Sequence, residues 1–220
     1  MITLHHCHEA RSMRTLWLLH EMGLDFDLRI YPFGKALRAP EYLAIHPLGR
    51  VPCLEEDGLV LFETGAITEY LVEKYPEKGL GRLPGAAERA HWLQWLHYAE
   101  TVAVHGATLT QQHIVIYEDR DRSPFVMKLE RRRLEKALEV LDTHLADGRE
   151  YLLESGFSAI DTNVGYSVYV ARHFTPLQVF PHLAAYYNRL SARPAFAKSL
   201  PETPALFRQP FYDLRDDLAS

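Results

Sequence analysis

The sequence predicts a small α/β domain followed by an all-α domain. The first 32 residues have the order strand, helix, strand, which is the spacing of a parallel βαβ unit. Two apolar runs then flank Asp57-Gly58, a dipeptide typical of the tight turn of a β-hairpin. After residues 76–85, which are rich in proline and glycine, apolar residues recur only with the period of an α-helix.

Each element of the α/β domain has its own signal. The predicted elements are a strand over 1–7, a helix over 12–22 stopped by Gly23, a strand over 24–31 ended by Pro32, a short helical stretch within 34–47, the hairpin around Asp57-Gly58, and a helix over 64–75 halted by Pro76. In the second strand Leu24, Phe26, Leu28 and Ile30 alternate with polar residues, so we expect it to be half-buried. The order β-α-β-α-β-β-α predicts a mixed sheet with helices on its faces.

The break at 76–85 divides the chain into domains. We expect one domain over 1–76, a linker over 77–85 and a helical domain over 86–220. Within the helical domain, residues 86–117 form either one long helix or a bent pair.

Three further helices follow from their start signals. Ser123-Pro124 is an N-cap with proline at the first helical position. Ser158 to Asp161 reads S-x-x-D, a reciprocal helix cap that we interpret as structural. Another helix is predicted after Pro181.

Composition narrows the class of protein. The 220 residues are 47% apolar and 24% charged, which is ordinary for a globular protein, and the net charge of −5 argues against nucleic acid or an anionic membrane as a partner. Two cysteines, Cys7 and Cys53, cannot form a disulfide framework, so a reducing compartment is expected. No apolar run reaches the length of a membrane helix, and we find no leader peptide at the N-terminus. These features predict a cytoplasmic protein.

The stretch "LHHCHEARS" (Leu4 to Ser12) concentrates histidine and cysteine near the N-terminus. Strand alternation places His5 and Cys7 on one face and His6 and His8 on the other. Side chains divided between two faces cannot converge on a tetrahedral metal ion. We therefore expect no metal site here.

Three segments carry a resemblance to a known family. They are "HPLGRVPCLEEDGLVLFETGAITEYL" (His46 to Leu71), "RTLWLLHEMGLDFD" and "GFSAID". The first resembles the N-terminal domain of cytosolic glutathione transferases, bacterial-type, and the similarity extends over most of the chain. The resemblance implies a thioredoxin-like N-terminal domain, a helical-bundle C-terminal domain that contributes the second-substrate pocket, and a homodimer. In that fold the first strand is central, so we expect His5 and His6 to be packed and hydrogen-bonded.

The resemblance also implies an activity. We expect an enzyme that conjugates the thiolate of its co-substrate glutathione to a small electrophilic, apolar molecule, as in detoxification, without a metal, nucleic acid or membrane partner. A glutathione-dependent reductase of disulfides or peroxides is an alternative, and so is a non-catalytic binding or dimerisation protein with this fold.

Five residues are predicted to bind glutathione. The Val51-Pro52 bond precedes a strand, and a cis bond there would leave the Val51 backbone free to pair with the cysteinyl unit of the peptide, as the family does. Glu63 and Thr64 stand at a helix start, where free N–H groups receive the γ-glutamyl carboxylate and Glu63 pairs with the ammonium group. Arg50 is a candidate for the glycyl carboxylate.

The catalytic position departs from the family pattern. Family members lower the thiol pKa, ordinarily about 8.5, with Tyr, Ser or Cys after the first strand, whereas Glu9, Ala10 and Arg11 stand at those positions. Arg11, with the helix N-terminus, could stabilise the thiolate electrostatically. Ser12 could donate to the thiolate or only cap the helix. Cys7 is either a redox thiol or a packed core residue.

Overall fold

The α/β domain forms around a four-stranded sheet. The computed structural model describes residues 1–212. The elements are β1 (Ile2–His6), α1 (Met13–Met22), β2 (Phe26–Ile30), α2 (Pro40–Leu43), β3 (Cys53–Glu56), β4 (Leu59–Phe62) and α3 (Thr64–Lys74). The strand order is β2-β1-β3-β4, with β1 parallel to β2 and antiparallel to β3. This is the thioredoxin-like arrangement that the resemblance implies, and the predicted fold class is confirmed.

The two sheet predictions differ in outcome. Asp57 and Gly58 have φ of 51° and 86°, so both turn residues are left-handed and the hairpin prediction is confirmed. The alternation predicted for β2 is wrong at Ile30, which is 52% exposed, because β2 lies at the free edge of the sheet.

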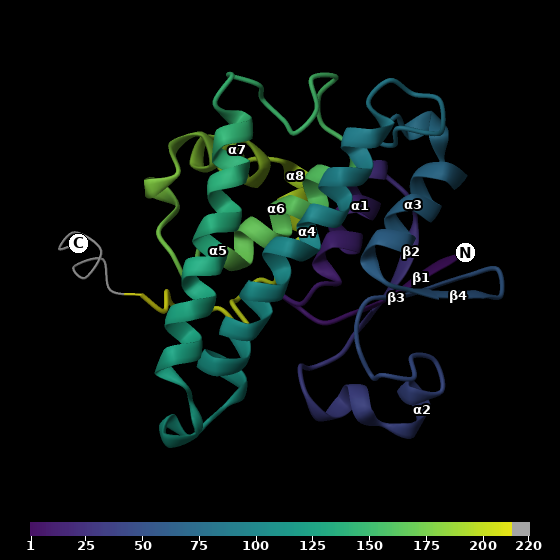
Figure 1. Cartoon of the computed structure of the whole chain (residues 1–220). Helices are drawn as coiled ribbons and strands as arrows, with labels where there is room; N and C mark the ends of the chain where they lie inside the picture. The colour runs from purple at the N-terminus through teal and green to yellow at the C-terminus, as the bar shows by residue number, and fades with distance from the viewer. Residues whose placement is uncertain (213–220) are drawn as a thin grey trace.

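The second domain is built from helices. They are α4 (Arg89–Thr110), a π-helical turn (Gln111–Val115), α5 (Pro124–Leu145), α6 (Ala159–Ala171), α7 (Pro181–Ser191) and α8 (Pro194–Ser199). Figure 1 shows α4 and α5 as a long pair and α6 crossing the middle of the molecule. The helix expected over 86–117 is thus one helix with a π-helical end, and the sequence did not indicate α8. None of the helices within residues 1–212 is long and apolar enough to cross a bilayer.

The predicted caps of α5 and α6 are confirmed. The Ser123 hydroxyl accepts a 3.3 Å hydrogen bond from the Val126 amide. The Asp161 carboxylate accepts a 2.8 Å bond from the Ser158 amide and a 2.9 Å bond from the Tyr186 hydroxyl. Burial raises the pKa of Asp161 to about 6. These bonds fix the start of α6, every residue of which is buried.

The two domains share one core, because α1 packs directly on α6 and α8. A Cβ atom at Gly165 of α6 would lie 2.8 Å from the Trp17 ring and 2.7 Å from Leu190, so only glycine permits this approach. Trp17 also contacts Phe196 of α8 edge to face, with centroids 4.9 Å apart. The loop before α1 is therefore held at a fixed position relative to the helical domain.

Candidate active site

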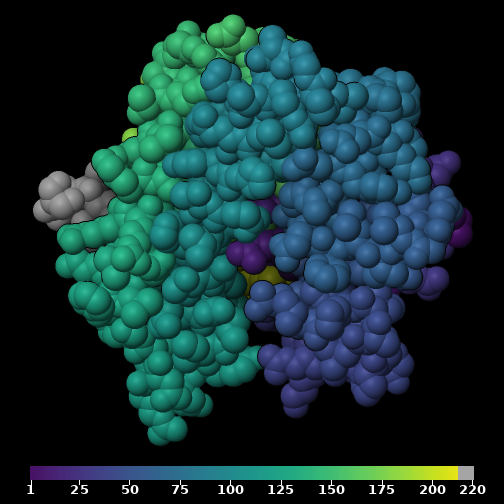
Figure 2. All heavy atoms as spheres, turned by 45° about the vertical axis from the view of Figure 1, so that its right-hand side comes forward, coloured from purple at the N-terminus to yellow at the C-terminus, as the bar shows by residue number. Residues whose placement is uncertain are grey.

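A hollow separates the α/β domain from the α4–α5 side of the molecule. Figure 2 shows that atoms from the start of the chain, coloured purple, lie at its bottom beside yellow atoms from the C-terminal part of the described chain. The purple atoms belong to the part of the sequence that includes the loop between β1 and α1, where the resemblance predicts the thiol chemistry. The predicted glutathione residues lie on the α/β side.

The strand edge at Val51 is open. The Val51–Pro52 peptide bond is cis, as predicted. Within residues 1–212 the Val51 backbone N–H and C=O have no hydrogen-bond partner. The preceding turn is held by the Tyr42 hydroxyl, which donates a 2.6 Å bond to the Arg50 carbonyl, and the Arg50 side chain is exposed. An extended peptide can pair with this edge.

The start of α3 offers a carboxylate and free backbone N–H groups, which complement the ammonium and carboxylate groups of an amino-acid terminus. Glu63 has φ of 77° and an exposed carboxylate that makes no hydrogen bond or ion pair within the described chain. Thr64 begins the helix, whose first N–H groups have no helical acceptor. The Thr64 hydroxyl turns inward, where it accepts a 2.9 Å bond from Arg14. Thr64 thus presents its amide, not its hydroxyl, at the helix end.

Arg14 is a site residue that the sequence did not reveal. Its side chain is 1% exposed, and its guanidinium also donates to the Glu100 carboxylate, the Ala99 carbonyl at 3.1 Å and the Ser167 hydroxyl at 2.8 Å. It therefore ties α1 to α3, α4 and α6 at one point. An arginine within the apolar run "MRTLWLL" was the only signal of this role.

Arg11 stands at the rim of the hollow. Its guanidinium lies 3.8 Å from the second oxygen of Glu100, and the two side chains are 38% and 51% exposed. Burial opposes ionisation of Glu100, but the charges of Arg14 and Arg11 and the hydrogen bonds from Arg14 and Thr64 together outweigh it and lower the pKa of Glu100. An exposed ion pair of this kind is weak, so the Arg11 guanidinium can be recruited by another anion. The backbone N–H groups of Arg11 and Ser12 have no acceptor within the described chain.

Ser12 faces the sheet instead of the hollow. It is fully buried, and its hydroxyl lies 2.9 Å from His6 Nδ1 and accepts a 3.1 Å bond from the Cys7 amide. The hydroxyl makes no capping bond to α1, so the capping interpretation is wrong. Burial and the nearby His8 lower the pKa of His6 to about 3, so the ring is neutral.

The rest of the histidine-rich stretch is packed. His5 is hydrogen-bonded to the Tyr31 hydroxyl at 2.8 Å and to Glu55 at 2.6 Å, as expected for a residue of the central strand. Cys7 is 2% exposed. Burial and the Glu9 carboxylate raise the pKa of the Cys7 thiol to about 11, so it is protonated at neutral pH. This environment favours the packed interpretation of Cys7.

Comparisons with known proteins settle the family. A model of the glutathione S-transferase N-terminal domain matches residues 1–73, and one of the C-terminal domain matches residues 120–189. Glutathione S-transferase 3 of Zea mays is 30% identical over 87% of this chain and 89% of its own length. The chain belongs to the glutathione S-transferase family. Glutathione S-transferase 3 of Schizosaccharomyces pombe is 28% identical over 89% of this chain and 85% of its own.

Solved transferases share the architecture. A glutathione transferase from Methylococcus capsulatus superposes with a TM-score of 0.78 at 26% identity, covering 90% of this chain and 97% of that one. Glutathione transferase F7 from Populus trichocarpa gives 0.79 at 28% identity, with the same coverage. A sphingomonad transferase solved with glutathione gives 0.76 at 25% identity, covering 90% and 96%. The predicted family and enzyme class, a glutathione transferase, are confirmed.

This transferase uses Glu9 in an unexpected way. Glu9 has φ of 60° and is 1% exposed. One carboxylate oxygen accepts hydrogen bonds from the backbone N–H groups of Ala205 at 2.8 Å, Leu206, and Phe207 at 3.1 Å, and the other accepts from the Tyr169 hydroxyl. Burial opposes ionisation, but these hydrogen bonds outweigh it and lower the pKa of Glu9. Sequence reasoning missed this role because the amide partners lie up to 198 residues away.

Three aromatic residues of the helical domain, Tyr166, His113 and Tyr117, have different surroundings. Tyr166 is 6% exposed and donates a 3.1 Å bond to the Glu9 carbonyl. His113 stacks on Phe211 at 5.0 Å. Tyr117 is 88% exposed and contributes nothing to a closed pocket within the monomer.

Proposed function

We propose that this transferase binds glutathione in the hollow and joins it through its sulfur to a small apolar electrophile. The observation that carries the proposal is the unpaired Val51 backbone edge together with the unpaired, exposed carboxylate of Glu63 at the start of α3. A tripeptide with an ammonium group and two carboxylates complements both features. The similar sphingomonad enzyme was solved in complex with glutathione, which supports the same ligand here.

Each part of glutathione has a proposed partner. The cysteinyl unit pairs with the Val51 backbone, next to Pro52. The γ-glutamyl carboxylate meets the first N–H groups of α3 at Thr64, and its ammonium group pairs with Glu63. The exposed Arg50 guanidinium is proposed for the glycyl carboxylate.

The thiol is activated electrostatically in this proposal. Arg11 and the N–H groups of Arg11 and Ser12 at the start of α1 stabilise the thiolate, and its proton passes to solvent. The thiolate then attacks the electrophilic carbon, forming a C–S bond, while the leaving group departs with the electrons of the bond that breaks. The Ser12 hydroxyl acts as a positioning group, because it bonds to His6 and Cys7 and holds the loop on β1.

A reductase that uses Cys7 gains no support from the site. A buried, protonated thiol is a poor nucleophile, since the thiolate is the reactive form. We expect Cys7→Ser to retain conjugation. Loss of a disulfide-reducing activity in that variant would instead favour the redox alternative.

We also propose that the enzyme is a homodimer. Leu48, Val60 and Phe62 are 65%, 43% and 36% exposed, and we call them the Leu48 patch. Leu48 and Phe62 are neighbours through His46, whose ring lies 4.7 Å from Phe62 and whose Nδ1 accepts a 3.2 Å bond from the Leu48 amide. Val60 lies two residues before Phe62 on β4, so both side chains project from the same face of that strand. A second copy that covers this patch would lie next to the open Val51 edge.

Titration calorimetry with glutathione tests the binding site. We expect the wild-type protein to bind and to conjugate an activated aryl chloride, and Glu63→Gln to bind about tenfold more weakly, the equivalent of 1.4 kcal/mol. Glu77→Gln is the matched control, since Glu77 is exposed and has no partner in the described chain. Absence of wild-type binding, or equal binding by Glu63→Gln and Glu77→Gln, would overturn the assignment.

A further inference from the structure

We infer that Glu9 sets the size of electrophile that the enzyme accepts, by holding the C-terminal strap, which we define as residues 205–211, across the bottom of the hollow. The inference rests on the proposed function for its catalytic readout. The attachment of the strap to the buried Glu9 carboxylate does not depend on the proposed function, because it follows from hydrogen bonds in the structure.

One oxygen atom of the Glu9 carboxylate accepts all three hydrogen bonds that attach the start of the strap, and we call this attachment the Glu9 anchor. Three consecutive amides of the strap, from Ala205 to Phe207, point at the same Glu9 oxygen, an arrangement that binds anions well. Tyr169 and Tyr166 hold the other side of Glu9, through its second carboxylate oxygen and its carbonyl. Substitution of the carboxylate therefore removes a charge that several donors share.

The far end of the strap has a separate, aromatic attachment. Phe207 is 4% exposed and stacks on His173 at 4.7 Å, with an interplanar angle of 19°. The Phe211 amide donates a 2.7 Å bond to the His173 carbonyl, and the Phe211 ring stacks on Phe174 at 5.5 Å. The strap is thus pinned by Glu9 at its start and by rings further along.

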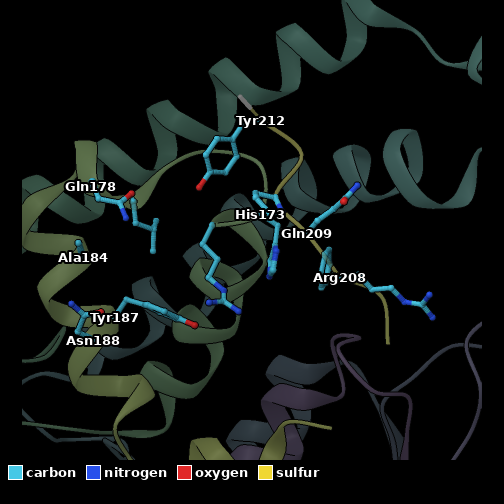
Figure 3. Close-up of a pocket in the computed structure, with 12 residues that line it drawn as sticks. His173, Gln178, Ala184, Tyr187, Asn188, Arg208, Gln209 and Tyr212 are labelled. Atoms are coloured by element: carbon cyan, nitrogen blue, oxygen red, sulfur yellow. The ribbon is translucent and has the colours of Figure 1, made fainter. Parts of the chain in front are cut away.

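Behind the strap there is room for it to move. A pocket of about 490 Å³ lies between the strap, residues 172–178 that follow α6, and helix α7. Figure 3 shows its wall, with His173, Gln209 and Tyr212 on one side and Gln178, Ala184, Tyr187 and Asn188 on the other. The strap is not backed by packed side chains where it borders this pocket, so the Glu9 anchor and the ring contacts together hold it in position.

The strap borders the space where the electrophile must sit. Glu9 lies two residues before Arg11 in the loop proposed to hold the sulfur, so the amides that it binds adjoin that loop. Leu206 is half-buried and Ala205 is exposed, which gives this part of the strap an apolar surface. Held against Glu9, this surface limits the depth available to a second substrate. Released into the pocket behind it, the strap leaves a deeper site.

Glu9→Gln tests the inference, with Glu202→Gln as the matched control because Glu202 is exposed and has no partner in the described chain. Hydrogen exchange reports the strap directly, and we expect the amides of 205–207 to exchange about tenfold faster in Glu9→Gln. Steady-state kinetics use two activated aryl chlorides, one with a single ring and one with two fused rings. In Glu9→Gln we expect the ratio of kcat/KM for the larger substrate to kcat/KM for the smaller one to rise about tenfold. The change should come from a lower KM for the larger substrate, and the affinity for glutathione should stay unchanged.

Phe207→Leu loosens the other attachment without touching Glu9. We expect the same direction of change in the substrate ratio, and a double variant whose ratio is less than the product of the single effects. Faster exchange in Glu9→Gln with an unchanged ratio would overturn the specificity role, and unchanged exchange would overturn the anchor. If the wild-type protein fails to bind glutathione, the proposed function fails, and the specificity role with it, while the exchange result still decides whether Glu9 anchors the strap.

Discussion

Arg14 donates a 2.9 Å hydrogen bond from its guanidinium to the hydroxyl of Thr64, which joins helix α1 to the residue that begins helix α3. Both helix starts are proposed to contact glutathione, α1 at the sulfur and α3 at the γ-glutamyl carboxylate. Because the guanidinium also binds Glu100 and Ser167 of the helical domain, one buried side chain fixes the spacing of the two subsites.

Replacement of Arg11 by methionine removes a charge while keeping a side chain of similar length. We expect the pKa of bound glutathione's thiol to rise toward 8.5, by no more than about one unit because the guanidinium is partly exposed to solvent. The ultraviolet absorbance of the thiolate against pH measures this shift. Arg29→Met, an exposed change on β2, is the control, and an equal thiol pKa in both variants would contradict a role for Arg11.

Arg14→Lys keeps the charge but cannot reproduce the fork of donors. We expect the free energy of unfolding to fall by about 2–3 kcal/mol, since buried acceptors on Thr64, Ala99 and Ser167 lose partners. Urea denaturation measures the loss, and calorimetry should show weaker glutathione binding at temperatures where the variant is folded. A stability within 0.5 kcal/mol of wild type, on the order of a typical surface change, would contradict this reading.

The enzyme should lose stability in acid through His173. Burial and the neighbouring Arg172 lower the pKa of His173 from 6.5 to about 4 in the folded protein. Between these two pKa values the unfolded chain therefore binds more protons than the folded protein. The stabilisation from neutral His173 is complete above pH 6.5. As the pH falls from 6.5 toward 4, the free energy of unfolding decreases by about 1.4 kcal/mol per pH unit.

His173→Phe should remove that part of the acid sensitivity. A phenylalanine ring preserves the stack on Phe207, while the interaction of the His173 ring with the Gln209 backbone is lost. Urea denaturation at pH values between 4 and 7 measures the slope, for which 6.5 and about 4 are the limiting pKa values. His6, whose pKa is also lowered by burial, leaves a residual slope in the variant. A slope equal to that of wild type would show that His173 titrates normally.

Leu48→Asp tests the proposed dimer. In the proposed dimer a carboxylate at position 48 would be buried without a partner, so we expect the variant to sediment as a monomer. Val179→Asp, which alters a side chain that is 60% exposed outside the patch, should leave the assembly unchanged. Wild-type protein that is monomeric at every concentration would refute the dimer.

Most of the fold could be predicted from local sequence patterns such as turns and helix caps. The Asp57-Gly58 turn, the Ser123 cap and the Ser158–Asp161 cap were readable because their partners lie within a few residues, where spacing alone predicts the contact. Alternation failed at Ile30, since a sequence does not state which strand lies at a sheet edge.

The site divides in the same way. The two-domain order, the Val51-Pro52 turn and the helix start at Glu63 could be predicted, because these features depend on neighbouring residues. The bonding of the Ser12 hydroxyl to His6 of the sheet, and of Glu9 to amides of residues 205–207, became visible only in the folded chain. A buried polar side chain bonds to the donors and acceptors that packing brings to it, and those partners come from distant parts of the chain.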